Sequence, residues 1–297
     1  MIAADLPNRR VEAWKYSDLR AALADTPLPQ DAPRPAHAWG KLDGVIDRLA
    51  LGLDRHALTK VRAGEEEILI ERLGGEGLDA SVREIQAPPG AALTRIVLQA
   101  GGGVVLNAAH VTLATGAKFR QLILADGAKL ARIETHVAIE GEGAEVEMNG
   151  IYMVANGRHA DLTSVVSHNV GGAKTTQLIK GVARAGGRGV FQGKIYVAHG
   201  AQKTDARQHH AALMLEEGAE INAKPELEIY ADDVQCAHGN AIGALDERQL
   251  FYARARGIPE AEARAMLVEA FLNEAVPEHL PDDLRMDVLA RIAGWLR

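Results

Sequence analysis

Between residues 67 and 243 the chain alternates short apolar segments with turns that are rich in glycine and alanine. Most segments, such as EILIERL and LTRIVLQA, are about five to nine residues long and favour Ile, Val, Leu and Thr, as β-strands do. We therefore predict a core of stacked β rungs, a solenoid in which each rung buries its face on the next. A β-sandwich is the alternative that the same pattern allows. A Gly-Ala dipeptide recurs between the segments, at residues 116–117, 127–128, 143–144, 172–173, 200–201 and 218–219.

The segment before this core has a helical pattern. Residues 1–66 are predicted to form a helical N-terminal region, because Val11, Trp14, Leu19 and Leu23 make a loose apolar stripe at helical spacing. Prolines then break the pattern and predict a linker or an extended arm, at positions 27, 29, 33 and 35.

Residues 244–297 are predicted to form a helical C-terminal region. Asp246 suits the N-cap of a first helix, with Gln249 three residues further on, and Gly257 suits the C′ position. Pro259 suits the first position of a second helix. The apolar residues of this second helix recur at helical spacing and predict one buried face, made of Ala263, Met266, Leu267, Ala270 and Phe271.

Composition and charge narrow the setting in which the chain works. The 297 residues carry a formal net charge of -7 and contain no strongly basic run, which argues against nucleic acid as a partner. A single cysteine excludes an internal disulfide and fits a reducing cytoplasm. We expect neither a signal peptide nor a membrane span, because the sequence has no apolar segment of the required length.

Cys236 and His238 are the strongest candidates for chemistry. Cys236 is the only cysteine, and on a strand residues at i and i+2 point to the same face. A thiolate beside an imidazole suits soft or borderline metals. Taken alone, a lone cysteine or histidine is more often a buried structural residue, so the pair is the argument.

Other candidate motifs fail or predict ordinary structure. The stretch from Gly187 to Lys194 lacks the spacing of a Walker A loop, so we expect no ATP hydrolysis by this chain. His209 and His210 are adjacent and should face opposite sides of a strand, so at most one can join an inward site. No histidine pair has metal-ligand spacing elsewhere, and we expect structural roles for His110, His136, His159, His168 and His199.

Several stretches resemble the SufB/SufD family of iron–sulfur cluster assembly proteins, and its SufD branch in particular. They are DDVQCAHG followed by ALDERQLFYARARGIPEAEA, the upstream stretches GRGVFQGKIYV, QKTDARQHHAALML and AEINAKPELEIYADDV, and LPNRRVEAWKYSDLR near the start. The resemblance is dense between residues 181 and 271 and over residues 6–20. His209-His210 and Asn240-Ala241 depart from the pattern expected of the family.

The resemblance implies a mainly β fold with a right-handed parallel β-helix core, which disfavours the sandwich. It also implies a non-enzymatic subunit that supports iron entry or cluster formation beside a SufB-like paralogue. One cysteine and one histidine cannot supply the four protein ligands that a cluster normally takes, so any cluster at Cys236 and His238 must be shared with another chain. We therefore expect no cofactor bound stably by this chain alone, and a homodimer is possible without the partners.

The C-terminal helices are implied to dock a SufC-like ABC-type ATPase. The candidate docking residues lie on the first helix, where aromatic and arginine side chains are typical of binding hot spots: Leu250, Phe251, Tyr252, Arg254 and Arg256. Two other interpretations stay open. One is a SufB-like scaffold, although such chains are generally longer and richer in cysteine. The other is a β-solenoid enzyme acting on carbohydrate, although no dense acidic face is visible in the sequence.

Overall fold

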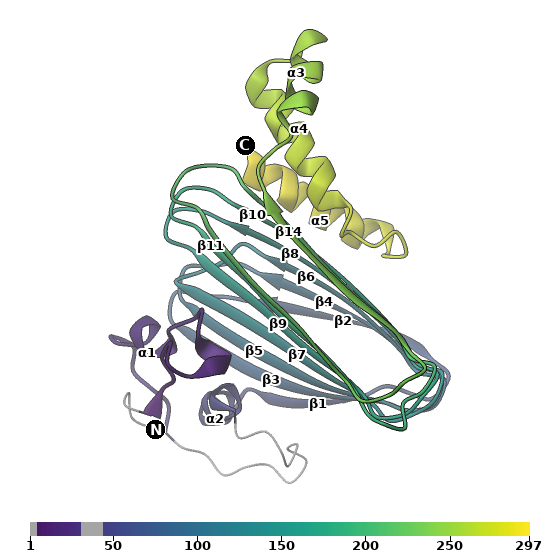
Figure 1. The fold of residues 1–297 in the computed structure, drawn as a ribbon. Coiled ribbons are helices and arrows are strands. Elements are labelled where there is room, and N and C mark those ends of the chain that lie inside the picture. Colours follow the sequence, from purple (N-terminus) through teal and green to yellow (C-terminus); the bar gives the residue numbers. More distant parts are fainter. Residues whose placement is uncertain (1–4, 31–43) are drawn as a thin grey trace.

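The computed structural model describes residues 5–30 and 44–297, and it is built around a coil of parallel strands (Figure 1). Odd-numbered and even-numbered strands form two separate seven-stranded sheets within the described residues. Two of the four prolines of the predicted linker, Pro33 and Pro35, lie outside the described residues.

Successive strands alternate between the two sheets, so each turn of the coil contributes one strand to each. The odd sheet contains β1 (His56–Lys60), β3 (Leu78–Ala87), β5 (Val104–Leu113), β7 (Leu130–Ile139), β9 (His159–His168), β11 (Arg188–Val197) and β13 (Glu220–Ile229). The even sheet contains β2 (Glu66–Leu73), β4 (Ala92–Gln99), β6 (Lys118–Ala125), β8 (Glu145–Val154), β10 (Lys174–Ala183), β12 (Asp205–Met214) and β14 (Gln235–Gly243).

All paired strands run parallel, which confirms a parallel β-helix and is incompatible with two antiparallel sheets packed face to face. The length of a turn changes along the coil. Leu78 pairs with Val104, 26 residues further on, whereas Arg188 pairs with Glu220, 32 residues further on. This drift is the reason why no fixed period is visible in the sequence. Strand pairing begins at β1, within the segment 1–66 that was expected to be helical.

Most of the predicted Gly-Ala dipeptides make the turns of the coil. At Gly116, for example, the backbone is in the left-handed region (φ 64°), which only glycine adopts at little cost, and Ala117 is then fully buried. The pair at Gly200 differs, because there the left-handed residue is Lys203 (φ 63°). The glycines of the dipeptides with positive φ are Gly116, Gly127, Gly143, Gly172 and Gly218.

The space between the sheets is filled mainly by aliphatic side chains, together with the buried aromatic rings of Phe119, Tyr152 and Phe191. Tyr152 on β8 is fully buried, and its ring lies against two glycines on neighbouring strands. A Cβ atom at Gly181 would come within 1.9 Å of the ring, and one at Gly189 within 2.2 Å. The Tyr152 hydroxyl lies 3.0 Å from Nε2 of His210, which satisfies its polar tip.

Of the three C-terminal helices, the second and third pack on the outer face of the even sheet, and the first extends beyond the coil (Figure 1). The three helices are α3 (Glu247–Ala255), α4 (Glu260–Asn273) and α5 (Asp282–Leu296). As predicted, Asp246 caps α3, accepting a hydrogen bond from the Arg248 backbone, and Gly257 follows α3 with a positive φ of 87°. Pro259 lies one residue earlier than predicted, at the N-cap of α4.

The predicted buried face of α4 is correct only in part: Ala263 is buried and Phe271 packs against the core, but Met266 and Ala270 are exposed. The side chains of α4 that are buried are Ala263, Val268 and Leu272, whereas Met266 is 51% exposed. The error arises because α4 contacts two neighbours, α3 and α5, as well as the sheet, so its apolar residues are divided among more than one direction. No helix within residues 5–30 and 44–297 combines the length and the apolar character needed to cross a membrane.

The N-terminal segment lies against the odd sheet, on the opposite side of the coil (Figure 1). The expected helix between Val11 and Leu23 is divided into a short 3-10 helix, η2 (Glu12–Trp14), and a single turn, α1 (Leu19–Ala22). Asp18 accepts a hydrogen bond from the Ala21 backbone and so starts α1 anew. Helix α2 (Val45–Gly52) follows and packs on β3 and β5.

Replacing Gly181 by Ala is expected to destabilise the coil by about 1–3 kcal/mol, because the added Cβ must displace the Tyr152 ring from a closely packed core. The free energy of unfolding, from equilibrium urea denaturation, measures this effect. Gly200→Ala is the matched control, since a Cβ there meets nothing within 4 Å and should leave the stability nearly unchanged. Equal stabilities of the two variants would contradict this packing.

Candidate functional site

Cys236 and His238 lie on β14, the last strand of the even sheet. They pair in register with Ala206 and Gln208 on β12, and β14 has no further strand beside it on its other edge among the described residues. Cys236 is half-buried and packs with the inner cluster that contains Ala206, whereas His238 is exposed. Both residues therefore belong to the inner face of the coil, at the end where the last turn leaves that face uncovered.

The neighbouring Asn240 supports this orientation of β14. Its side-chain oxygen lies 2.7 Å from Nδ1 of His210, which is 1% exposed inside the coil. His238 is two residues from Cys236 and two from Asn240 on the same strand, so its Cα–Cβ bond points to the same face as theirs.

The thiol of Cys236 is not activated by its surroundings. Burial raises the pKa of the Cys236 thiol, and the Asp205 carboxylate raises it further, against the opposing effect of a hydrogen bond with the Ala206 backbone. The group is therefore protonated at neutral pH. A metal or cluster that binds here must displace the thiol proton, so its affinity increases with pH.

The pair is not joined by other ligands within its own chain. In the described parts of the chain, no three His, Cys, Asp or Glu side chains come together in an arrangement that could hold a metal ion. Cys236 and His238 therefore provide at most a part of a four-ligand site.

His209 and His210 face opposite sides of β12, as their adjacency predicts. His209 is exposed, whereas His210 lies between the rings of Tyr152 and Phe191, with ring centroids 6.0 Å and 5.2 Å away. Burial lowers the pKa of His210 to about 4, so the ring is neutral at pH 7. A neutral ring can donate a hydrogen bond from Nδ1 to the Asn240 side-chain oxygen and accept one at Nε2 from the Tyr152 hydroxyl. The two departures from the family pattern thus contact each other.

The residues predicted to dock an ATPase lie on α3, and most of them are exposed. Phe251 and Tyr252 are 72% and 61% exposed, and Arg256 packs over the Tyr252 ring at 5.0 Å. Arg254 is also exposed and forms an ion pair with Glu260 at 3.3 Å. Leu250 is only 2% exposed, so it holds α3 in place and does not belong to the surface. An apolar groove of about 470 Å³ lies between α3 and Leu267 of α4, and Tyr252 and Arg256 line it.

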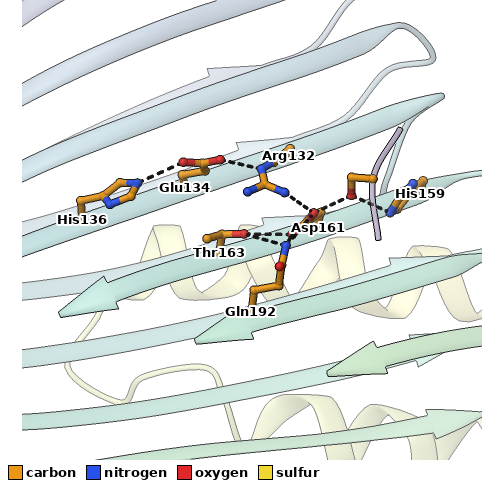
Figure 2. A network of polar contacts seen from close by, with 8 residues as sticks. Arg132, Glu134, His136, His159, Asp161, Thr163 and Gln192 are labelled. Atoms are coloured by element: carbon orange, nitrogen blue, oxygen red, sulfur yellow. Dashed lines mark hydrogen bonds and ion pairs between the residues drawn. The ribbon is translucent and has the colours of Figure 1, made fainter. Parts of the chain in front are cut away.

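A second polar cluster, which includes His136 and His159, lies on the outer face of the odd sheet (Figure 2). Arg132 on β7 is 2% exposed, and it donates to Glu134 at 2.5 Å and to Asp161 at 2.9 Å. Its guanidinium also packs over the Trp14 ring at 4.2 Å. Burial alone would raise the pKa of Glu134, but the Arg132 charge and the hydrogen bond with His136 lower it, so Glu134 stays ionised.

This cluster fastens the N-terminal segment to the coil. The buried Ser17 hydroxyl donates to Asp161 at 2.5 Å, and Nε2 of His159 lies 3.3 Å from the Ser17 hydroxyl oxygen. In a catalytic triad the acid orients the histidine and the histidine contacts the serine, whereas here both groups contact Ser17 directly. Ser17 is fully buried, so the arrangement positions the segment and presents no nucleophile. Polar residues two apart on one strand, Arg132, Glu134 and His136, are the signal from which the sequence could have predicted a polar outer face.

A cleft of about 520 Å³ adjoins the cluster, between the odd sheet and the N-terminal segment. His110 and His136 lie on its floor with ring centroids 5.2 Å apart, and Asp47 of α2 forms part of its wall. Nε2 of His110 is 3.5 Å from the Asp47 carboxylate, and Nε2 of His136 is 3.0 Å from Glu134. Each imidazole is thus paired with a carboxylate, and the structure does not bring either one near Cys236.

These features define a parallel β-helix protein with a half-buried thiol and an imidazole on its terminal turn. Residues 45–271 match the family model described as SUF system FeS cluster assembly, SufBD core domain. The chain is 38% identical over 170 residues to the iron–sulfur cluster assembly protein SufD of Escherichia coli, covering 57% of this chain and 40% of that protein. The chain belongs to the SufBD family of the SUF system for iron–sulfur cluster assembly.

Other relatives support this assignment over different lengths. A SufBD family protein of Mycobacterium tuberculosis is 30% identical over 302 residues, covering 97% of this chain and 74% of that protein. The chloroplastic protein ABCI7 of Arabidopsis thaliana is 38% identical over 173 residues, covering 57% of this chain and 36% of its own length. The chain thus spans well under two thirds of the length of the Escherichia coli and Arabidopsis relatives.

Alkylation of Cys236 by iodoacetamide is expected to reach its half-maximal rate at a higher pH than alkylation of a small free thiol. The reason is that burial and Asp205 keep the thiol protonated, and only the thiolate reacts. Because the chain has one cysteine, mass spectrometry of the intact protein follows this single site. Asp205→Asn removes one of the two causes and should shift the profile toward lower pH. A wild-type midpoint at or below that of the free thiol would contradict the protonated state.

Proposed function

We propose that this chain is a SufD-like, non-enzymatic subunit of a complex with a SufB-like paralogue and a SufC-like ABC-type ATPase. In this complex it supports iron entry or cluster formation at a subunit interface. The observation that carries the proposal is the position of Cys236 and His238 on the terminal strand, where a second chain can complete the ligand set. Membership of the SufBD family supports the same role.

The composition of the terminal turn favours β14 as the edge that pairs with the paralogue. Strand β13 carries four charged residues and Pro225, and charges and proline are the features by which edge strands resist pairing. Strand β14, QCAHGNAIG, contains no proline, carboxylate, lysine or arginine, and most of its side chains are small. The strand that holds the candidate ligands is therefore the one that can accept a partner strand, so pairing would bring the partner's ligands to the site.

The chemistry of the pair suits assembly better than storage. A protonated thiol and one imidazole bind a metal weakly until other ligands join them, and a ligand-poor site releases its contents readily. Cluster formation in this scheme uses the iron and sulfide as cargo. A SufB-like scaffold role is the less favoured alternative, because this chain can contribute only one thiolate.

The α3 surface is the proposed docking site for the ATPase. Phe251 and Tyr252 are exposed on α3, and Tyr252 lines the apolar groove that reaches Leu267. Large exposed aromatic side chains next to arginines are typical of binding hot spots. In Figure 1, α3 extends beyond the coil, where a partner can reach it without displacing a strand.

Changing Cys236 or His238 to Ala is expected to reduce cluster formation in the reconstituted complex, because either change removes one ligand of a shared site. Anaerobic reconstitution, followed by visible absorbance and acid-labile sulfide, measures the effect. His209→Ala is the control, since His209 is exposed on the opposite face of the adjacent strand. Wild-type cluster levels in His238→Ala would remove His238 from the proposal, and a stable cluster on the isolated wild-type chain would refute the shared site.

Replacing Phe251 and Tyr252 together by Ala should weaken binding of the ATPase by about 2 kcal/mol or more if either is a hot spot. Both side chains are mostly exposed, so the melting temperature of the isolated chain should change little. Titration calorimetry with the purified ATPase measures the affinity. Met286→Ala, at an exposed residue of α5, is the matched control. An unchanged affinity in the double variant would place the docking surface elsewhere.

A further inference from the structure

One column of side chains inside the coil is polar, although its surroundings are mostly apolar. It runs along the inner face of the even sheet at one register position, from strand to neighbouring strand. Met148 is the one apolar residue within it. The members of the column, in order from β4 to β14, are Arg95, Gln121, Met148, Gln177, Gln208 and His238.

The deep members of this column have hydrogen-bond partners. Arg95 donates to Glu71 at 2.6 Å and to Gln121 at 2.7 Å. The Ser164 hydroxyl donates to Oε1 of Gln177 at 2.8 Å. Arg95 and Gln121 are thus paired with each other, whereas Gln177 is paired at Oε1 and has no partner at Nε2 among the described residues.

Gln208 is different. Its side chain is 2% exposed, yet neither Oε1 nor Nε2 has a hydrogen-bond partner within the described part of the chain. Leaving a buried polar atom unpaired destabilises a protein, so a buried amide with both atoms unpaired needs an explanation.

The backbone opposite Gln208 makes space for its amide. A Cβ atom at Gly193, on the facing strand β11, would come within 2.3 Å of Oε1 and 2.6 Å of Nε2. The amide therefore crosses the interior to a position that only glycine leaves open. Only the last turn covers it, and there the next member of the column is His238, which pairs in register with Gln208.

We propose that Gln208 is a positioning residue for His238, with Oε1 accepting one ring N–H of the imidazole. This inference rests on the proposed role of His238 as a ligand. A histidine that binds a metal through one nitrogen usually donates from the other to an oxygen, and this bond fixes both tautomer and ring orientation. Side chains on adjacent strands at paired positions are close enough for this contact. The bond would also give a buried amide oxygen the partner that it lacks.

The test is nuclear magnetic resonance of the full-length chain with ¹⁵N-labelled histidine, in which His238 is identified by the signals lost in His238→Gln. In the wild type, His238 should populate a single tautomer with one ring N–H proton protected from solvent exchange. His209, which is exposed on the outer face of the adjacent strand, serves as the internal reference. A mixture of His238 tautomers with rapid exchange in the wild type would overturn the proposal, and no variant is needed for this result.

Three variants at two positions separate positioning from a general effect on the fold. Gln208→Met keeps the shape but removes the acceptor, so protection of the His238 ring proton should be lost. Gln208→Glu keeps an acceptor and should retain it. Gln177→Met, one strand deeper in the same column, should leave His238 unchanged. If Gln208→Met raises the melting temperature and leaves the His238 signals as in the wild type, then Gln208 is only an unpaired buried amide and the proposal is wrong.

A second readout connects this contact to the assembly site. In the complex with the paralogue, Gln208→Met should lower the affinity for Co²⁺, used as a spectroscopic probe, by roughly 10–100-fold, as loss of such an orienting partner does elsewhere. The two proposals can fail separately. If His238→Ala builds clusters normally while the isolated chain shows the tautomer coupling, the assembly role fails and the contact stands. If His238 is needed for clusters but its tautomer ignores Gln208→Met, only the present inference fails.

Discussion

In-register parallel pairing between successive turns is the constraint on which the rest of this structure depends. Each inner strand satisfies its backbone polar groups through its two neighbours in the same sheet, so that, among the described residues, the unpaired sheet edges lie in the first and last turns. Side chains inside the coil are therefore inaccessible to other molecules along most of its length. Reactive groups that must meet another molecule are restricted to an end or to an outer face, and Cys236 and His238 are at an end.

The same pairing places residues about one turn apart in the sequence directly side by side. Each side chain therefore has neighbours on the adjacent strands as well as along its own strand. A substitution at one position therefore alters the contacts of the side chain at the paired position of the next turn. His210 and Asn240, 30 residues apart, show this coupling, because each provides the hydrogen-bond partner that the other needs. Tyr152 shows it through shape, since its ring requires glycine at Gly181 on the adjacent strand.

Local patterns predicted the elements of this fold, and contacts between distant segments could not be predicted in the same way. The strands, the turns at Gly116 and the cap at Asp246 depend on neighbours in sequence, and these were predicted from the sequence. Strand β1 was missed because its five residues follow directly on a helical pattern. The contact of Ser17 with Asp161 joins residues 144 apart, and no local signal indicates it. The sequence placed Cys236 and His238 on one face, but the uncovered end of that face became visible only from the strand order.

The way in which the C-terminal helices are attached has a mechanical consequence. Helix α4 is held by Val268 and Leu272, which pack with α5 on strands from the middle of the even sheet, whereas α3 extends beyond the coil (Figure 1). Helices α4 and α5 therefore connect α3 to the middle of the β-helix. A force applied to α3 would be transmitted through α4 and α5 to several strands of the even sheet at once.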